Sequence, residues 1–406
     1  MNSNRRNKTL FNASKVVFIS SSIPVEIYTI FLLSSSDGGK IIFGLLMMGS
    51  LAILIGLQPA IGRMIDAVKR RTLIRWLQLS SLVIEVFIFI AWYLNAVPSI
   101  ILLSGFLMYV DVSEAFYFNA MSALLQTISG TGSYVRSNGL SEISGQLPSM
   151  IGPAMAIPVL HFLGPRISLL LSASLASVSL LLISFLNEDY IPPRRVRGRN
   201  DKMAGTISVI MAFPKQVVLI YLLNFPFIMV MVGNLVKPVF IVSVLHGGVA
   251  DLSLSEMGYA AFAAMTGLFM SIFPVKNEMA SAFLFFSIYL AGIILMPFAS
   301  EFAIYMILQS LHGIGNPGTR ISRNSFVMRH VPRELHGRFS SSVSMFSNIT
   351  RISILAVFTA EINLVSPVDL LLTMGIITAA ALLMAAVLKR SVDMRPLSSG
   401  IPLPVK

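Results

Sequence analysis

The stretch "GRMIDAVKRR", residues 62–71, places five charged side chains between two long apolar runs. The whole chain is 55% hydrophobic and only 12% charged, whereas an ordinary soluble domain has roughly 25% charged residues. A chain with so little charge cannot cover its surface in water. We therefore expect this stretch to be a short polar loop between two segments that cross a membrane.

Apolar runs of about 20 residues recur along the chain, and a helix of that length crosses a bilayer core of about 30 Å. Lipid offers backbone groups no hydrogen-bond partners, so such runs must be helices, and a barrel would show alternating segments of about ten residues instead. The sequence predicts an all-α membrane protein with twelve transmembrane helices at about 16–34, 41–60, 75–97, 99–124, 138–162, 166–186, 217–245, 256–274, 280–299, 302–326, 340–362 and 367–388.

The positive charges predict the orientation of these helices, because Lys and Arg near helix ends remain on the cytoplasmic side. If the N-terminus lies inside, the segments on the outer side contain only two basic residues, Lys40 and Arg166, and all other loop Lys and Arg residues lie on the cytoplasmic side. Both termini are therefore expected in the cytoplasm. The net charge of +12 follows from the same asymmetry, so it does not predict nucleic-acid binding. The absence of cysteine excludes disulfides and thiolate-bound metals, and we expect no metal or other cofactor.

A polar stretch, "NEDYIPPRRVRGRNDK" at 187–202, divides the chain nearly in half. The two halves echo each other at an offset of about 200 residues, as Pro24 and Pro226 illustrate. Two six-helix repeats are common in secondary transporters. The predicted parts are a cytoplasmic tail at 1–15, a first half at 16–186, a cytoplasmic linker at 187–215, a second half at 216–389 and a tail at 390–406.

The opening stretch, with Gly62, Asp66, Arg70 and Arg71 at their spacings, resembles the signature loop of the major facilitator superfamily. The resemblance implies that Asp66 meets a helix N-terminus of the other half and stabilises the outward-facing state, an arrangement that we call the latch. It implies that Arg70 and Arg71 anchor the loop. Ala67 and Lys69 depart from the family pattern. The alternative is a loop that only retains positive charge in the cytoplasm.

A second stretch, "RSNGLSEISGQLPSMIGPAMA" at 136–156, resembles the fourth loop and fifth helix of bacterial facilitator exporters, including those for siderophores and macrolides. The resemblance adds Arg136 to the latch and gives a helix-five motif formed by Gly145, Gly152 and Pro153. This motif is incomplete, because Pro148 and Ala156 stand where glycines are commoner. Ordinary helix packing through small residues is the alternative interpretation.

Ionisable side chains at membrane depth cost at least about 2.5–3.5 kcal/mol, so they mark cavities or partners. In the fold that the resemblance implies, most of them fall on helices that line the central cavity, and the acids lie in the first half while the bases lie in the second. We find nine: Glu26, Glu85, Asp111, Glu114, Glu142, Lys237, Arg320, Arg323 and Arg351.

The acids divide into coupling candidates and structural ones. Asp111 and Glu114 share a helix face at spacing i,i+3, where two carboxylates favour holding a proton between them. We expect these two and Glu26, which has Ser22 one turn before it, to bind protons. Glu85 is on a peripheral helix of the implied fold and is expected to have a structural partner. Glu142 is expected to reach water.

The bases of the second half are candidates for contact with substrate. Lys237, Arg320 and Arg351 are the predicted cavity residues. Lys237 could instead extend toward the membrane surface, and Arg323 is expected to reach water. The stretch "GIGNPG", 313–318, indicates close helix contact or a flexible break.

The sequence favours a secondary transporter rather than an enzyme, because no nucleophile–base set or phosphate-binding loop is present. The resemblances predict a monomeric exporter in a bacterial inner membrane. It would move a small amphiphilic or charged compound, such as an antibiotic, a siderophore or a peptide-like natural product, in exchange for protons. The alternative is an uptake permease, or a membrane partner protein of the same fold that does not transport.

Overall fold

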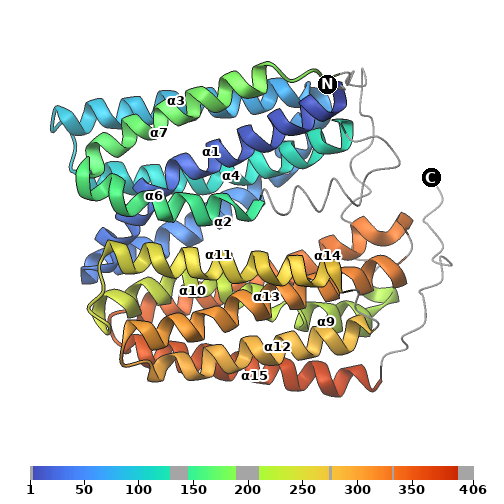
Figure 1. Cartoon of the computed structure of the whole chain (residues 1–406). Coiled ribbons are helices and arrows are strands. Elements are labelled where there is room, and N and C mark those ends of the chain that lie inside the picture. The colour runs from blue at the N-terminus through green and yellow to red at the C-terminus, as the bar shows by residue number, and fades with distance from the viewer. Residues whose placement is uncertain (1–2, 129–144, 189–209, 274–276, 332, 392–406) are drawn as a thin grey trace. The chain divides into compact units, whose positions relative to one another are not determined.

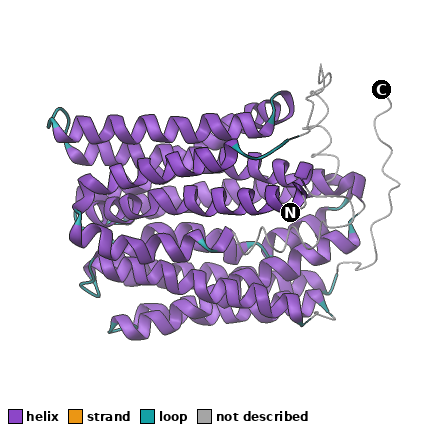
Figure 2. Cartoon of the chain, turned by 45° about the horizontal axis from the view of Figure 1, so that its top comes forward, coloured by secondary structure: helices purple, strands orange, loops and turns teal. Residues whose placement is uncertain are grey.

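The computed structural model describes residues 3–128, 145–188, 210–273, 277–331 and 333–391, and all regular structure in these ranges is helical (Figures 1 and 2). Nine helices in these ranges are long and apolar enough to cross a membrane. The chain is therefore a multi-pass membrane protein whose regular structure, over the ranges given above, is helical. By their contacts its residues form two compact units, Met1–Val196 with Pro238–Ala261, and Arg197–Lys237 with Phe262–Lys406.

Several helices of the first unit extend beyond the apolar runs that predicted them. α1 begins at Ser3 rather than at 16, because backbone hydrogen bonding continues where the side chains become polar. The bounds are α1 Ser3–Ser34, α2 Asp37–Ala67, α3 Arg70–Tyr93, α4 Ser99–Ile128, α6 Pro148–Phe162 and α7 Gly164–Ser184.

The predicted loop at 62–71 is thus mostly helical. Gly62–Ala67 completes α2 and Arg70 begins α3, so only Val68 and Lys69 separate the two helices. Our expectation of a polar loop at 62–71 was wrong in this respect. The apolar run predicted at 41–60 ends where charged residues begin, but α2 continues for about two further turns, to Ala67.

The second-half helices contain one break that the sequence did not predict. The apolar run 217–245 forms two helices, which are separated at Leu223 and Asn224. The helices from this point on are α9 Pro214–Leu222, α10 Phe225–Ser243, α11 Val249–Ile272, α12 Glu278–Leu295, the short 3₁₀ helix η1 Met296–Phe298, α13 Phe302–His330, α14 Arg333–Glu361 and α15 Pro367–Lys389.

α1 is the central helix of the first unit, where it packs against α2, α4, α6 and α7. The buried face of α7 is built largely of small residues, including Ser172, Ala176 and Ser179. Small side chains allow membrane helices to approach closely. At this contact Gln78 Nε2 of α3 donates to Ser14 Oγ of α1 (3.1 Å) and to Ser179 Oγ (2.7 Å), so hydroxyl and amide groups connect three helices.

The glycines of "GIGNPG" lie where α13 meets α12 in the second unit. A Cβ atom on Gly315 would lie 2.5 Å from the backbone nitrogen of Tyr289, and one on Gly318 would collide with the ring of Phe285. α13 is a continuous helix through Pro317. Close helix contact is therefore confirmed as the reason for these glycines, and the flexible break is excluded.

Substitution of this contact glycine should destabilise the protein. Gly315→Ala places a methyl group against helix backbone, which cannot move aside as a side chain can, and overpacking of this kind costs about 1–3 kcal/mol. Thermal unfolding of the purified protein in detergent measures the change. Gly267→Ala on α11 is the matched control, because no described atom beyond its own turn of helix lies within 4 Å of an added Cβ. Equal unfolding temperatures of the two variants would contradict the close contact.

Candidate functional site

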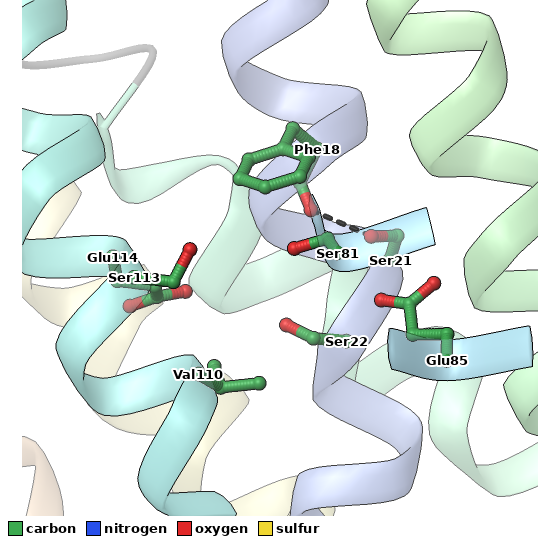
Figure 3. Close-up of a pocket in the computed structure, with 8 residues that line it drawn as sticks. All are labelled: Phe18, Ser21, Ser22, Ser81, Glu85, Val110, Ser113 and Glu114. Carbon is green, nitrogen blue, oxygen red and sulfur yellow. Dashed lines mark hydrogen bonds between the residues drawn. The ribbon is translucent and has the colours of Figure 1, made fainter. Parts of the chain in front are cut away.

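The first unit contains a small cavity between α1, α3 and α4 (Figure 3). α1 contributes one face of residues spaced at three to four positions, and α4 contributes residues from successive turns. Both spacings place their side chains on one side of a helix. The lining residues are Phe18, Ser21, Ser22, Ser81, Glu85, Val110, Ser113 and Glu114.

Three predicted coupling residues lie close together in this region. Glu114 lines the cavity, and its carboxyl group interacts electrostatically with those of Glu26 and Asp111. Glu26 in turn has Ser22 beside it, one turn earlier on α1. The structure thus brings together acids from α1 and α4 that are about 85 residues apart in the sequence. Neighbouring carboxylates in a membrane interior can avoid mutual repulsion by binding protons or other cations.

Glu85 on α3 is a fourth member of this group, which the sequence analysis did not recognise. It is 2% exposed, lines the cavity and interacts electrostatically with Glu26. Its Oε2 atom has no hydrogen-bond partner among the described residues. Ser172 of α7 is a hydrogen-bonding neighbour of this carboxyl group, so a structural partner of the expected kind is present beside the cavity. The available signal was the cost of an acid at membrane depth, which we discounted because α3 is peripheral in the implied fold.

The hydroxyl groups around the cavity are oriented by their own helix. Ser21 Oγ donates to the carbonyl oxygen of Phe18 (2.7 Å; Figure 3), and Ser22 Oγ donates to that of Ile19 (3.4 Å). These bonds are of the local kind that Ser makes within a helix. Ser21 thereby uses its hydroxyl hydrogen and leaves its oxygen lone pairs for other groups, whereas Ser22 is also a hydrogen-bonding neighbour of the Glu26 carboxyl group.

The second unit contains a buried polar cluster around Lys237 of α10. Lys237 is 6% exposed, and its Nζ donates to Gln309 Oε1 of α13 (3.1 Å). The same oxygen lies 3.1 Å from His312 Nδ1, and the His312 ring packs on Tyr289 of α12 with centroids 4.7 Å apart. The alternative in which Lys237 extends to the membrane surface was therefore wrong. Gln309 Oε1 thus lies between the Lys237 ammonium group and the His312 ring.

The break between α9 and α10 is held by polar contacts with two other helices. Arg323 Nη1 of α13 donates to Asn224 Oδ1, and Asn224 Nδ2 donates to Ser347 Oγ of α14 (2.7 Å). Arg323 is half-buried and also donates to Asn324 Oδ1 (3.1 Å from Nη2). Arg320, one turn earlier, is also half-buried and interacts electrostatically with Arg323. Arg351 on α14 is half-buried as well.

The predicted separation of charges by sign does not hold at the helix ends. Lys15 is buried on α1 of the first unit, with Nζ 5.9 Å from the ring centroid of Phe118. In the second unit, buried Glu278 at the start of α12 forms an ion pair with Arg329 (2.7 Å). The separation therefore applies only to the nine deeper residues that defined it.

The loop between α2 and α3 is anchored by a carboxylate that the sequence analysis assigned to the linker. Glu188 accepts the backbone N–H of Arg70 at Oε1 (3.0 Å) and that of Arg71 at Oε2 (2.9 Å), and Arg71 Nη1 donates to the carbonyl oxygen of Leu186. A carboxylate is favourable at a helix N-terminus, whose N–H groups lack partners within the helix. The pattern of apolar residues did not indicate this contact, because Glu188 lies just after the sixth apolar run, 166–186, in the predicted linker.

The remaining latch residues lie outside the part that can be described. Gly62 and Asp66 lie in α2, but the surroundings of Gly62 and the side chain of Asp66 are not described. Arg136 lies within 129–144, outside the described residues, as does Glu142, which was expected to reach water. The three residues of the helix-five motif, in contrast, have described surroundings. Gly152 contacts Ile23 of α1 so closely that a Cβ would collide with it, and Pro153 is buried within α6. A Cβ on Gly145 would lie 3.3 Å from Lys15 Nζ.

Comparisons with known proteins agree with this architecture. The family model described as "Major Facilitator Superfamily" matches residues 9–355. No curated protein matches the chain.

Solved structures that are similar to the chain include transporters with several kinds of cargo in their descriptions. An auto-inhibited POT family peptide transporter is 11% identical with a TM-score of 0.71, and covers 98% of this chain and 99% of its own. The nucleoside transporter NupG is 14% identical (TM-score 0.65, 97% and 100%). A bacterial homologue of the iron transporter ferroportin, in an inward-facing state, is 13% identical (TM-score 0.67, 95% and 98%).

At these identities the solved structures establish the fold, and the family model establishes the membership. The fold implies a small-molecule substrate and a lipid environment. The chain belongs to the major facilitator superfamily, as a multi-pass membrane protein with the fold of a transporter.

Proposed function

We propose that this protein is a secondary active exporter that moves a small amphiphilic or charged compound out of a bacterial cytoplasm in exchange for protons. The observation that carries the proposal is the group of acids in the first unit, where Glu26, Asp111 and Glu114 interact in a membrane interior. Acids at that depth are costly and are retained where they bind a coupling ion or a substrate. The substrate classes are antibiotics, siderophores and peptide-like natural products.

The proposed topology has twelve transmembrane helices with both termini in the cytoplasm of a monomer. Nine of the helices in the described ranges meet the length and hydropathy needed for a span, and the other apolar runs supply the remainder. The proposed parts are the tail 1–15, the half 16–186, the linker 187–215, the half 216–389 and the tail 390–406.

Export is favoured over uptake by the helix-five motif. Gly152 permits the close contact of α6 with α1, and Pro153 follows it within the helix. The resemblance of this motif to that of exporters supports export. An uptake permease, or a membrane partner protein that does not transport, remains the second candidate. Transport into everted membrane vesicles, compared with right-side-out vesicles, distinguishes the two directions.

The substrate would contact the bases of the second unit. Lys237 is a buried ammonium group, and Arg320 presents a planar guanidinium that suits carboxylate or phosphate. Together with Arg351 these bases favour a compound with at least one anionic group. The latch would consist of Gly62, Asp66, Arg70, Arg71 and Arg136, of which Arg70 and Arg71 are held by Glu188.

The coupling prediction concerns Glu114. Cells that express the protein are loaded with a panel of anionic and zwitterionic compounds in sodium-free potassium buffer, and the retained amount of each compound is measured. An uncoupler should abolish export of the compound that the wild-type protein removes, because the proton gradient supplies the free energy. Glu114→Gln should reduce export at least about tenfold, since it removes an acid that binds the proton. Asp37→Asn, at an exposed outer helix end, should export normally. Export that survives the uncoupler would contradict proton coupling.

The substrate prediction concerns Arg320. If it binds an anionic group, Arg320→Lys should weaken export of that compound because a planar two-bond contact is lost although the charge remains. Arg320→Gln should cost more, on the order of 1.5–3 kcal/mol for a hydrogen bond to a charged group. Concentration dependence of export in everted vesicles gives both values. Undiminished export of every anion by Arg320→Lys would exclude the contact.

The latch prediction concerns Asp66. Asp66→Asn should leave the amount of protein in the membrane unchanged while it slows export, because a carboxylate at a helix N-terminus is worth about 0.3–1 kcal/mol, or up to about 2 kcal/mol when partly buried. Quantitative immunoblotting measures the amount, and initial rates measure export. A normal initial rate at a normal amount of protein would refute the role of Asp66.

A further inference from the structure

The cavity between α1, α3 and α4 offers only oxygen atoms as polar ligands. Six of its eight lining side chains are carboxylates or hydroxyls, and the other two, Phe18 and Val110, are apolar. Oxygen donors without nitrogen or sulfur suit hard cations. The chemistry of the lining therefore indicates a cation rather than an anion or a soft metal.

Hydrogen bonds strengthen this preference. Ser21 and Ser22 donate their hydroxyl hydrogens to carbonyl oxygens of α1, and Ser81 Oγ lies 3.1 Å from Tyr109 Oη. A hydroxyl that donates to the backbone retains two lone pairs as acceptors. Ser21 thus presents an electron-rich oxygen to whatever occupies the cavity.

Two further polar atoms of the lining lack partners. Glu85 Oε2 and Ser113 Oγ have no hydrogen-bond partner among the described residues, although these residues are only 2% and 6% exposed. A buried polar atom left unsatisfied is costly and uncommon. Figure 3 shows Glu85 on α3 and Ser113 on α4 across the cavity, with Ser22 of α1 between them. Both atoms belong to the lining of one cavity, so each is available to a cation bound there.

We infer that this cavity is a binding site for a monovalent inorganic cation of the size of sodium, with Glu85, Glu114 and the surrounding serine oxygens as its ligands. Two of the lining side chains, Glu85 and Glu114, are carboxylates. Two carboxylates with neutral hydroxyls therefore favour a single positive charge over a divalent ion, which requires more charge or retained water molecules.

Other charged groups lie near the cavity and influence whether its carboxyl groups bind a proton or a cation. Glu26 on α1 and Asp111 on α4 interact with Glu114, and Lys15 on α1 has its ammonium group beside Phe118. A cation requires ionised carboxylates, so protons and sodium compete for the same oxygens. The inference goes beyond the proposed export, with which it shares only Glu114, and it requires neither a substrate nor a gradient.

The experiment measures binding of radioactive sodium to the purified full-length protein in detergent. The wild-type protein should bind sodium saturably at about pH 8, and acidification to about pH 5 should displace it, because carboxylates protonate in this direction. Glu85→Gln should abolish binding. Ser113→Ala, which removes one neutral ligand, should weaken it about tenfold. Size-exclusion chromatography verifies that each variant is folded.

Two control variants keep the test specific. Asp37→Asn removes an exposed carboxylate, and Ser177→Ala removes a hydroxyl of α7 that donates to Ala173 outside the cavity; both should bind sodium as the wild type does. Absence of saturable binding by the wild type, or full binding by folded Glu85→Gln and Ser113→Ala, would overturn the inference. Displacement of sodium by choline at equal concentration would also overturn it, because the site would then accept an organic cation. Proton-driven export in sodium-free buffer is measured separately, so failure of one proposal does not imply failure of the other.

Discussion

The low polarity of the membrane interior is the constraint on which the rest of this structure depends. It forces the backbone into helices, because each N–H and C=O group must find a partner within its own segment. It also makes every ionisable side chain at depth expensive. The chain nevertheless retains Glu26, Glu85, Asp111 and Glu114 in one region of the first unit. This concentration of costly groups is the reason that we propose this region as the place where the protein binds ions.

The packing of the helices follows from the same constraint. Lipid tails are as apolar as leucine, so helices gain little by burying apolar surface and associate through close contact and polar groups instead. Gly315 lets α13 reach the backbone of α12, and Gln78 joins Ser14 to Ser179 across three helices. The two units use charge differently, since the cavity of the first offers oxygens whereas the buried cluster of the second centres on the ammonium group of Lys237.

The sequence predicted the elements that depend on hydrophobicity and missed those that depend on individual polar contacts. The apolar runs correspond to helices, and the proximity of Asp111 to Glu114 follows from their spacing on α4. The break at Asn224 was not predictable, because it lies within an apolar run and is held by Arg323 and Ser347, which are about 100 residues away or more. The position of Glu85 was missed for a related reason: the periodicity of α3 places it on a buried face without revealing which neighbour it meets.

The central claim of this account is that the buried acids of the first unit gain and lose protons. Infrared difference spectroscopy of the purified protein, recorded between alkaline and acidic sodium-free buffer, measures this most directly, because a protonated carboxyl group absorbs apart from a carboxylate. The account predicts a carboxylic-acid band that appears on acidification and is reduced in Glu26→Gln and in Glu114→Gln, but not in Asp37→Asn. A band of the same intensity in all four proteins would contradict it, since the titrating acids would then lie elsewhere.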